Sequence, residues 1–61
     1  MSTVHVIISV KYPDRRNQSD YKEVFHIGLD FEDGIQIPFS KLYEGLRLLF
    51  PRKDAIICFS V

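Results

Sequence analysis

Residues 38–50 read PFSKLYEGLRLLF, and this stretch has the periodicity of an amphipathic helix. Its large apolar side chains recur every three or four residues, which places them along one face of a helix. The stripe consists of Phe39, Leu42, Tyr43, Leu46, Leu49 and Phe50. Pro38 suits the first helical position, and Pro51 cannot continue the helix. The spacing therefore predicts one helix over residues 38–50, packed through this stripe on a sheet.

Two residues of the predicted helix are unusual for a helix that only packs on a sheet. Leu48 points to the opposite side of the helix, so we expect it to be exposed. Gly45 lies in mid-helix, where glycine costs about 1 kcal/mol of stability relative to alanine. We therefore expect a close approach of another group at Gly45.

A third predicted strand follows the helix, over residues 55–61 (AIICFSV). It is apolar on both faces at several positions, which favours either a central strand or a seam between two copies. Cys58 is the one cysteine of the chain, so an intrachain disulfide is excluded. We interpret Cys58 as a small buried apolar residue.

Two further predicted strands precede the helix, over residues 4–12 and 21–29, with a polar hairpin loop between them. Both alternate in the manner of half-buried strands. In the second strand this alternation puts Glu23 on the same face as Phe25 and Ile27. A buried carboxylate needs a partner or an exit to solvent. Either Glu23 lies where the sheet face opens to water, or it is a polar group placed beside an aromatic patch.

The segment between the second strand and the helix is acidic: residues 30–34 read DFEDG. We interpret it as a loop that contains Asp30, Glu32 and Asp33. Negative charge is favourable near a helix N-terminus because it interacts with the helix dipole.

The order β-β-α-β predicts an α+β fold in one domain, residues 1–61. The third strand can pair beside the first, giving a three-stranded antiparallel sheet covered on one face by the helix. The other face has a mixed apolar character that a monomer leaves unsatisfied. Its predicted members are His5, Ile7, Val24, Ile56 and Cys58. We therefore expect a homodimer, since two-fold dimers are the commonest assembly.

Charge and composition exclude several classes of function. Eight basic and eight acidic residues give a net charge of zero, whereas nucleic-acid binders usually carry a basic excess. We expect no direct contact with nucleic acid. The N-terminal apolar stretch lacks a basic leader, and no stretch is long enough to cross a bilayer. We expect a cytoplasmic protein without a membrane partner.

The residues that usually carry catalysis or bind metals are scattered. His5, His26 and Cys58 have no paired ligand spacing of the kind found in zinc sites. The serines have no nearby pattern of histidine and aspartate. We therefore predict a protein that is not an enzyme and that binds no metal and no cofactor.

Phe39 and Tyr43 are the candidate working surface. They lie one helical turn apart, so their side chains are neighbours. They could be core residues packed on the sheet. Alternatively, they could line a cavity shared by two protomers and rimmed by Glu23, which would accept an apolar side chain of a partner.

The chain resembles the small dimeric uracil-DNA glycosylase inhibitors carried by phages of Bacillus. One matching segment is PFSKLYEG, in which Phe39, Leu42 and Tyr43 match the helix motif of that family. The other is YKE, in which Glu23 aligns with a strand glutamate. The length and the order of elements are similar too. The hairpin loop is longer here and carries Arg15 and Arg16, where that family is acidic.

The resemblance implies an inhibitor of uracil-DNA glycosylase. In that family the helix aromatics of a homodimer form a hydrophobic pocket, which captures the apolar side chain that the enzyme inserts into the DNA minor groove. Acidic groups nearby imitate DNA phosphates. The partner-binding residues expected here are Glu23, Phe39, Leu42, Tyr43 and Leu46, with Asp30, Glu32 and Asp33 as the acidic groups.

Two alternatives to glycosylase inhibition follow from the same surface. The chain could be an interaction protein of a mobile element that inhibits a different host enzyme. It could also be a structural or regulatory subunit that docks on a larger complex through its apolar face.

Overall fold

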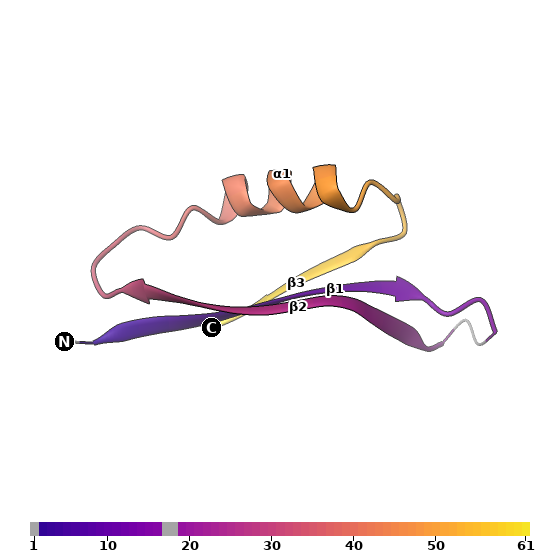
Figure 1. Ribbon diagram of the computed structural model, residues 1–61, viewed down its shortest axis with the longest axis horizontal. Coiled ribbons are helices and arrows are strands. Elements are labelled where there is room, and N and C mark those ends of the chain that lie inside the picture. The colour runs from indigo at the N-terminus through magenta and orange to yellow at the C-terminus, as the bar shows by residue number, and fades with distance from the viewer. Residues whose placement is uncertain (1, 17–18) are drawn as a thin grey trace.

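The described part of the chain folds into three strands and one helix (Figure 1). The computed structural model describes residues 2–16 and 19–61. The elements are β1 (Thr3–Pro13), β2 (Tyr21–Glu32), α1 (Phe39–Leu49) and β3 (Ile56–Ser60). The strands form one antiparallel sheet in the order β2-β1-β3. The predicted α+β fold is confirmed, including the pairing of the third strand beside the first. Within the described ranges no helix has the length and apolar character needed to span a membrane.

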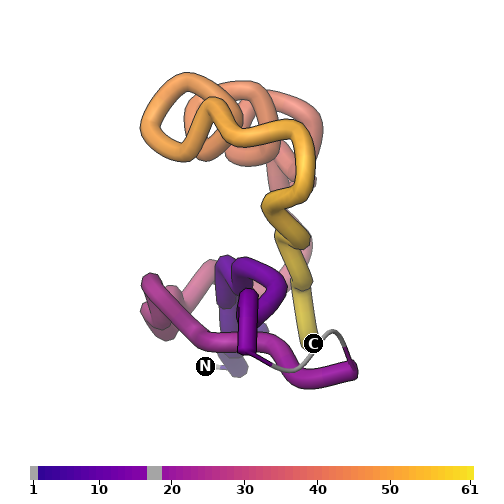
Figure 2. Tube along the Cα trace, turned by 90° about the vertical axis from the view of Figure 1, so that its right-hand side faces the viewer, coloured from indigo at the N-terminus to yellow at the C-terminus, as the bar shows by residue number. Residues whose placement is uncertain are grey.

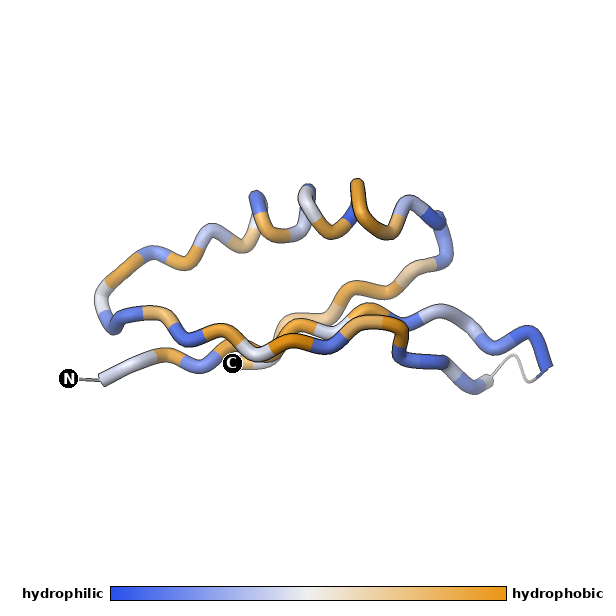
Figure 3. Tube along the Cα trace, viewed as in Figure 1, coloured by the Kyte–Doolittle hydropathy of each residue, from blue (hydrophilic) through white to orange (hydrophobic). Residues whose placement is uncertain are grey.

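The central strand β1 supplies most of the core. Val6, Ile8 and Val10 alternate along β1 and are at most 2% exposed, because all three point toward α1. Leu46 of α1 and Ala55 before β3 complete the buried set. The middle of the sheet and one stripe of α1 are hydrophobic, whereas the hairpin end of the sheet is hydrophilic (Figure 3).

Aromatic contacts hold α1 over the sheet. The ring of Phe50, which follows α1, lies 5.5 Å from that of Phe25 and 6.4 Å from that of Tyr12. At the other end of the helix, the rings of Phe39 and Phe59 lie 5.5 Å apart. Figure 2 shows the result: α1 stands above β1 and β2, and β3 rises along one side. The helix is therefore anchored at both ends.

A β-bulge in β2 changes the face on which Glu23 lies. Val10 pairs with Phe25 but Lys11 pairs with Glu23, so Val24 is an extra residue on β2. Glu23 thus shares the face of Lys11, which points away from α1. The prediction that Glu23 lies on the face of Phe25 is wrong, because the bulge interrupts the period of two on which it rested.

The acidic segment also differs from its prediction. Residues 30–32 continue β2, with Asp30 opposite His5 and Glu32 opposite Thr3. Phe31, opposite Val4, prolongs the apolar alternation of the strand and is half-buried. The turn is confined to the next residues, where Gly34 has a φ of 89°, a conformation that glycine adopts at little cost. The predicted loop over residues 30–34 was therefore wrong for its first three residues.

Three smaller predictions can be compared directly with the structure. Leu48 is 84% exposed, as predicted. The strand at the C-terminus lies at an edge of the sheet, so the central-strand alternative is wrong within one chain. A Cβ built on Gly45 meets nothing within 4 Å. Any close approach at Gly45 must therefore come from outside the described chain.

Candidate protein-binding site

Phe39 and Tyr43 form a half-exposed aromatic pair on α1. Their exposed fractions are 39% and 41%, so neither side chain is a core residue in the single chain. The rings of Phe39 and Phe59 make an edge-to-face contact, at an interplanar angle of 78°. The pair therefore has a supported underside and an accessible outer surface, which is the form that an aromatic binding surface needs.

Leu42 and Leu46 lie beneath this pair, toward the sheet. Leu46 is only 8% exposed and belongs to the core, and Leu42 is half-buried against it. They support the helix on the sheet. The structure therefore brings four of the predicted helix residues together but presents Phe39 and Tyr43 as the accessible ones.

Arg47 fixes the position of Tyr43 and was not singled out from the sequence. Its Nε donates a hydrogen bond of 3.0 Å to the Tyr43 hydroxyl, and its guanidinium carbon lies 5.4 Å from the centre of that ring. Its Nη1 donates to the backbone oxygens of Arg52 and Ala55, at 3.1 and 3.4 Å. The spacing of four residues between Tyr43 and Arg47 was the available signal.

The connection that accepts these bonds from Arg47 is itself held in place. Arg52 donates two hydrogen bonds to the Asp54 carboxylate, at 2.9 and 2.6 Å. These bonds, with the attraction of the guanidinium charge, lower the pKa of Asp54 below its usual value. The guanidinium carbon of Arg52 also lies 4.2 Å from the centre of the Tyr12 ring. The turn between α1 and β3 is thus tied to the sheet.

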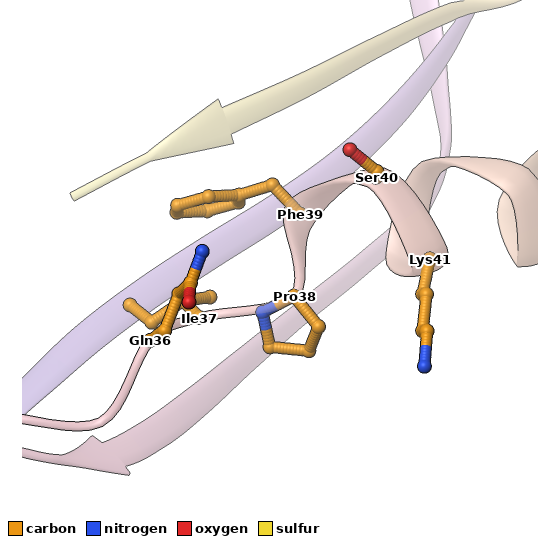
Figure 4. Close-up of a pocket in the computed structure, with 6 residues that line it drawn as sticks. All are labelled: Gln36, Ile37, Pro38, Phe39, Ser40 and Lys41. Atoms are coloured by element: carbon orange, nitrogen blue, oxygen red, sulfur yellow. The ribbon is translucent and has the colours of Figure 1, made fainter.

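An open hollow of about 500 Å³ lies at the N-terminal end of α1, lined by residues 36–41 (Figure 4). Phe39 forms one wall, and Lys41 projects away from the Phe39 ring. A second, smaller groove is lined by Leu42, Gly45 and Leu49 among others. The aromatic pair therefore adjoins a concave surface that could receive an apolar side chain.

The acidic residues do not surround the aromatic pair in the single chain. The Glu23 carboxylate lies 3.0 Å from Nδ1 of His26, and that of Asp30 lies 2.6 Å from Nδ1 of His5. Both pairs lie on the sheet face that points away from α1. Asp33 accepts a hydrogen bond of 2.8 Å from the Ser2 hydroxyl. Within the single chain, the bulge and the extension of β2 therefore put Glu23 and Asp30 on the face of the sheet away from Phe39 and Tyr43.

Neither family models, curated proteins nor solved structures gave a match to this chain. In residues 2–16 and 19–61, no three side chains of His, Cys, Asp or Glu are grouped so that they could hold a metal ion. The absence of a cofactor remains a prediction. What the described geometry offers is a supported, accessible aromatic surface.

Proposed function

We propose that this protein inhibits uracil-DNA glycosylase by binding the apolar side chain that the enzyme inserts into the DNA minor groove. The observation that carries the proposal is the half-exposed pair Phe39 and Tyr43, one turn apart on α1. The resemblance of PFSKLYEG to the helix motif of the phage inhibitors names the enzyme. An enzyme whose inserting side chain is occupied cannot engage DNA productively.

Aromatic side chains with one supported face suit such a role. Tyrosine and other large side chains contribute most of the binding free energy in many protein interfaces. They bury a large surface area, and few side-chain torsions have to be fixed when they bind. Arg47 holds the Tyr43 ring before a partner arrives. Holding the ring in one position lowers the entropic cost of binding.

Charge has a smaller part in the proposal. Asp30, Glu32 and Asp33 would face basic groups that normally contact DNA phosphates, but Asp30 already has a histidine partner. The net charge of the chain is zero. Glu23 lies on the far face of the sheet. We therefore assign capture of the apolar side chain to the aromatic pair alone, with acidic mimicry as a secondary contribution.

In this proposal the protein acts in the cytoplasm of a host cell, as a homodimer, without an enzymatic activity and without touching DNA itself. The same aromatic surface could serve an inhibitor of a different host enzyme. Recovery of another enzyme and no glycosylase from host lysate would favour that alternative.

Uracil excision from duplex DNA tests the proposal. Purified glycosylase is incubated with increasing amounts of the protein before labelled uracil-containing DNA is added. We expect excision to fall to background once the inhibitor exceeds the enzyme. Excision should return when further free glycosylase is added in excess of the inhibitor. Full excision at a large molar excess of the protein would reject glycosylase as the target.

The salt dependence of binding separates apolar capture from phosphate mimicry. Because the aromatic pair carries no charge, we expect the dissociation constant for glycosylase to change less than about threefold between 50 and 200 mM salt. A protein that binds DNA through many phosphate contacts loses on the order of a thousandfold over this range, because binding releases counterions condensed on the DNA. A binding mode dominated by acidic groups would shift in the same direction. Calorimetric titrations at the two salt concentrations measure the difference. A steep loss would transfer the main role to the acidic residues.

A further inference from the structure

We propose that the groove along α1 at Gly45 binds an acidic amphipathic helix of a second protein, with a large apolar side chain of that helix inserted over Gly45. This surface is separate from the aromatic pair and gives the protein a further partner. The proposal does not depend on the identity of the enzyme that is inhibited.

Gly45 has no reason within its own chain to be glycine. It lies inside α1, where alanine would be more favourable. Of the described glycines only Gly34 has a positive φ, so the backbone at position 45 does not require glycine. A Cβ built there meets nothing within 4 Å, so the packing of the chain does not require it either. The space beside Gly45 is therefore open to a group from another molecule.

The residues around Gly45 have the spacing of a hole that receives a side chain from a facing helix. In knobs-into-holes packing, the hole is made by four residues at i, i+3, i+4 and i+7. The apolar lining of the groove has this spacing, with Leu46 as a floor that is 8% exposed and Leu49 as a wall that is 71% exposed. Its four members are Leu42, Gly45, Leu46 and Leu49. An inserted apolar side chain would remove Leu49 from water.

The groove lies on the opposite flank of α1 from the aromatic pair. Gly45 follows Tyr43 by two residues, which is roughly 160° around the helix. Arg47, the partner of Tyr43, donates to the connection between α1 and β3, so that flank lies toward β3. Gly45 is therefore on the flank toward β2. There Ile27 of β2, on the sheet face toward α1, is still 39% exposed. A helix lying beside α1 would cover apolar surface of both elements.

A helix is the partner structure that suits this surface. The backbone groups of α1 are hydrogen-bonded within the helix, so the groove offers none to an extended strand. A partner helix has its own backbone bonds satisfied, and so it covers an apolar groove without burying unpaired groups. The groove runs from Lys41 to Leu49, about two turns or 12 Å of α1. Two or three turns of an amphipathic helix fill this length.

The charge of the groove favours a foreign helix over a second copy of this chain. Among the described residues, Lys41 is the one charged side chain that lines the groove. A complementary helix carries glutamate or aspartate beside its apolar stripe. Since none of the described acidic residues lines the groove, a second copy would bring another lysine to it and no carboxylate.

Titration with synthetic helices tests the proposal, with no glycosylase present. The probe is a labelled peptide of about 16 residues of glutamate, alanine and leucine, with leucine at the a and d positions of its heptads. The control peptide has the same composition, with its leucines spread around all faces. We expect fluorescence anisotropy to show binding of the probe about tenfold or more tighter than that of the control. Equal affinity of the two peptides, or no binding of either up to about 1 mM, would overturn the proposal.

Gly45→Leu is the variant that separates a specific hole from general stickiness. It adds apolar surface but fills the space over the helix, so we expect the affinity for the probe to fall about tenfold or more. Glu44→Leu adds the same side chain at the adjacent exposed position outside the groove. We expect that control to stay within about threefold of the wild-type affinity. Unchanged or tighter binding by Gly45→Leu would contradict the proposal.

The stability of Gly45→Leu shows that lost binding is not lost folding. Because leucine is a better helix former than glycine and meets open space here, we expect the melting temperature to rise by about 3 to 6 °C. Circular dichroism measures this shift. Light scattering of the free protein provides the last check. A homodimer that the probe dissociates would show that a second copy occupies the groove, and would overturn its assignment to a foreign helix.

Discussion

Replacing Tyr43 with alanine weakens binding to uracil-DNA glycosylase by about thirtyfold or more, the loss typical of a central interface residue. Tyr43 is 41% exposed and already held by Arg47, so truncation removes a preorganised contact surface without opening the core. Titration of the inhibitor in an excision assay measures the loss. Phe39→Ala has an effect of similar size, with some loss of stability as well, because Phe39 supports Phe59.

An exposed position on the same helix is the matched control. Leu48 is 84% exposed, on the side of α1 opposite the apolar stripe. Leu48→Ala is expected to change the inhibition constant by less than about twofold. Inhibition that weakens equally for Leu48→Ala and Tyr43→Ala would place the binding surface elsewhere on the chain.

Replacing Ile8 with alanine destabilises the fold by about 3 kcal/mol, because it removes buried methyl groups from the centre of the core. Ile8 is 2% exposed between its neighbours on β2 and β3 and beneath α1. A domain of this length has a stability of roughly 3 to 9 kcal/mol. The substitution therefore removes about a third or more of the free energy of unfolding, which chemical denaturation measures.

The adjacent residue is the control for Ile8. Ile7 has the same side chain but points to the other face of the sheet, where it is only half-buried. We expect Ile7→Ala to cost about 1 kcal/mol or less in chemical denaturation. Equal costs for the two substitutions would contradict the assignment of the core to the face covered by α1.

Much of this fold could be predicted because its strands and helix follow regular periods. The alternation of Val6, Ile8 and Val10 defines one face of β1, and the stripe through Leu46 defines the face of α1. Burial of these two faces against each other specifies the order and the layers. The apolar pattern of the last strand did not decide its position, because apolar residues on both faces suit a central strand as well as an open edge. Its edge position followed instead from the order of the elements, which lets it pair beside the first strand.

The site was predicted less completely, and the reasons are local. The bulge at Val24 has no sequence signal of its own, yet it moves Glu23 to the other face. The acids at 30 and 32 resemble a loop, although Phe31 between them continues the strand. The contact between Arg47 and Tyr43 follows from helical spacing but was overlooked, since Arg47 lies off the apolar stripe. Phe39 and Tyr43 themselves remain the proposed surface.

A double-mutant cycle across the complex tests the central claim most directly. Tyr43→Ala is combined with an alanine substitution of the apolar side chain that the glycosylase inserts into DNA, and all four affinities are measured by calorimetry. If that side chain binds at Tyr43, the two losses overlap, with a coupling of about 1 to 3 kcal/mol. Losses that add independently, with a coupling below about 0.3 kcal/mol, would show that Tyr43 does not receive this side chain.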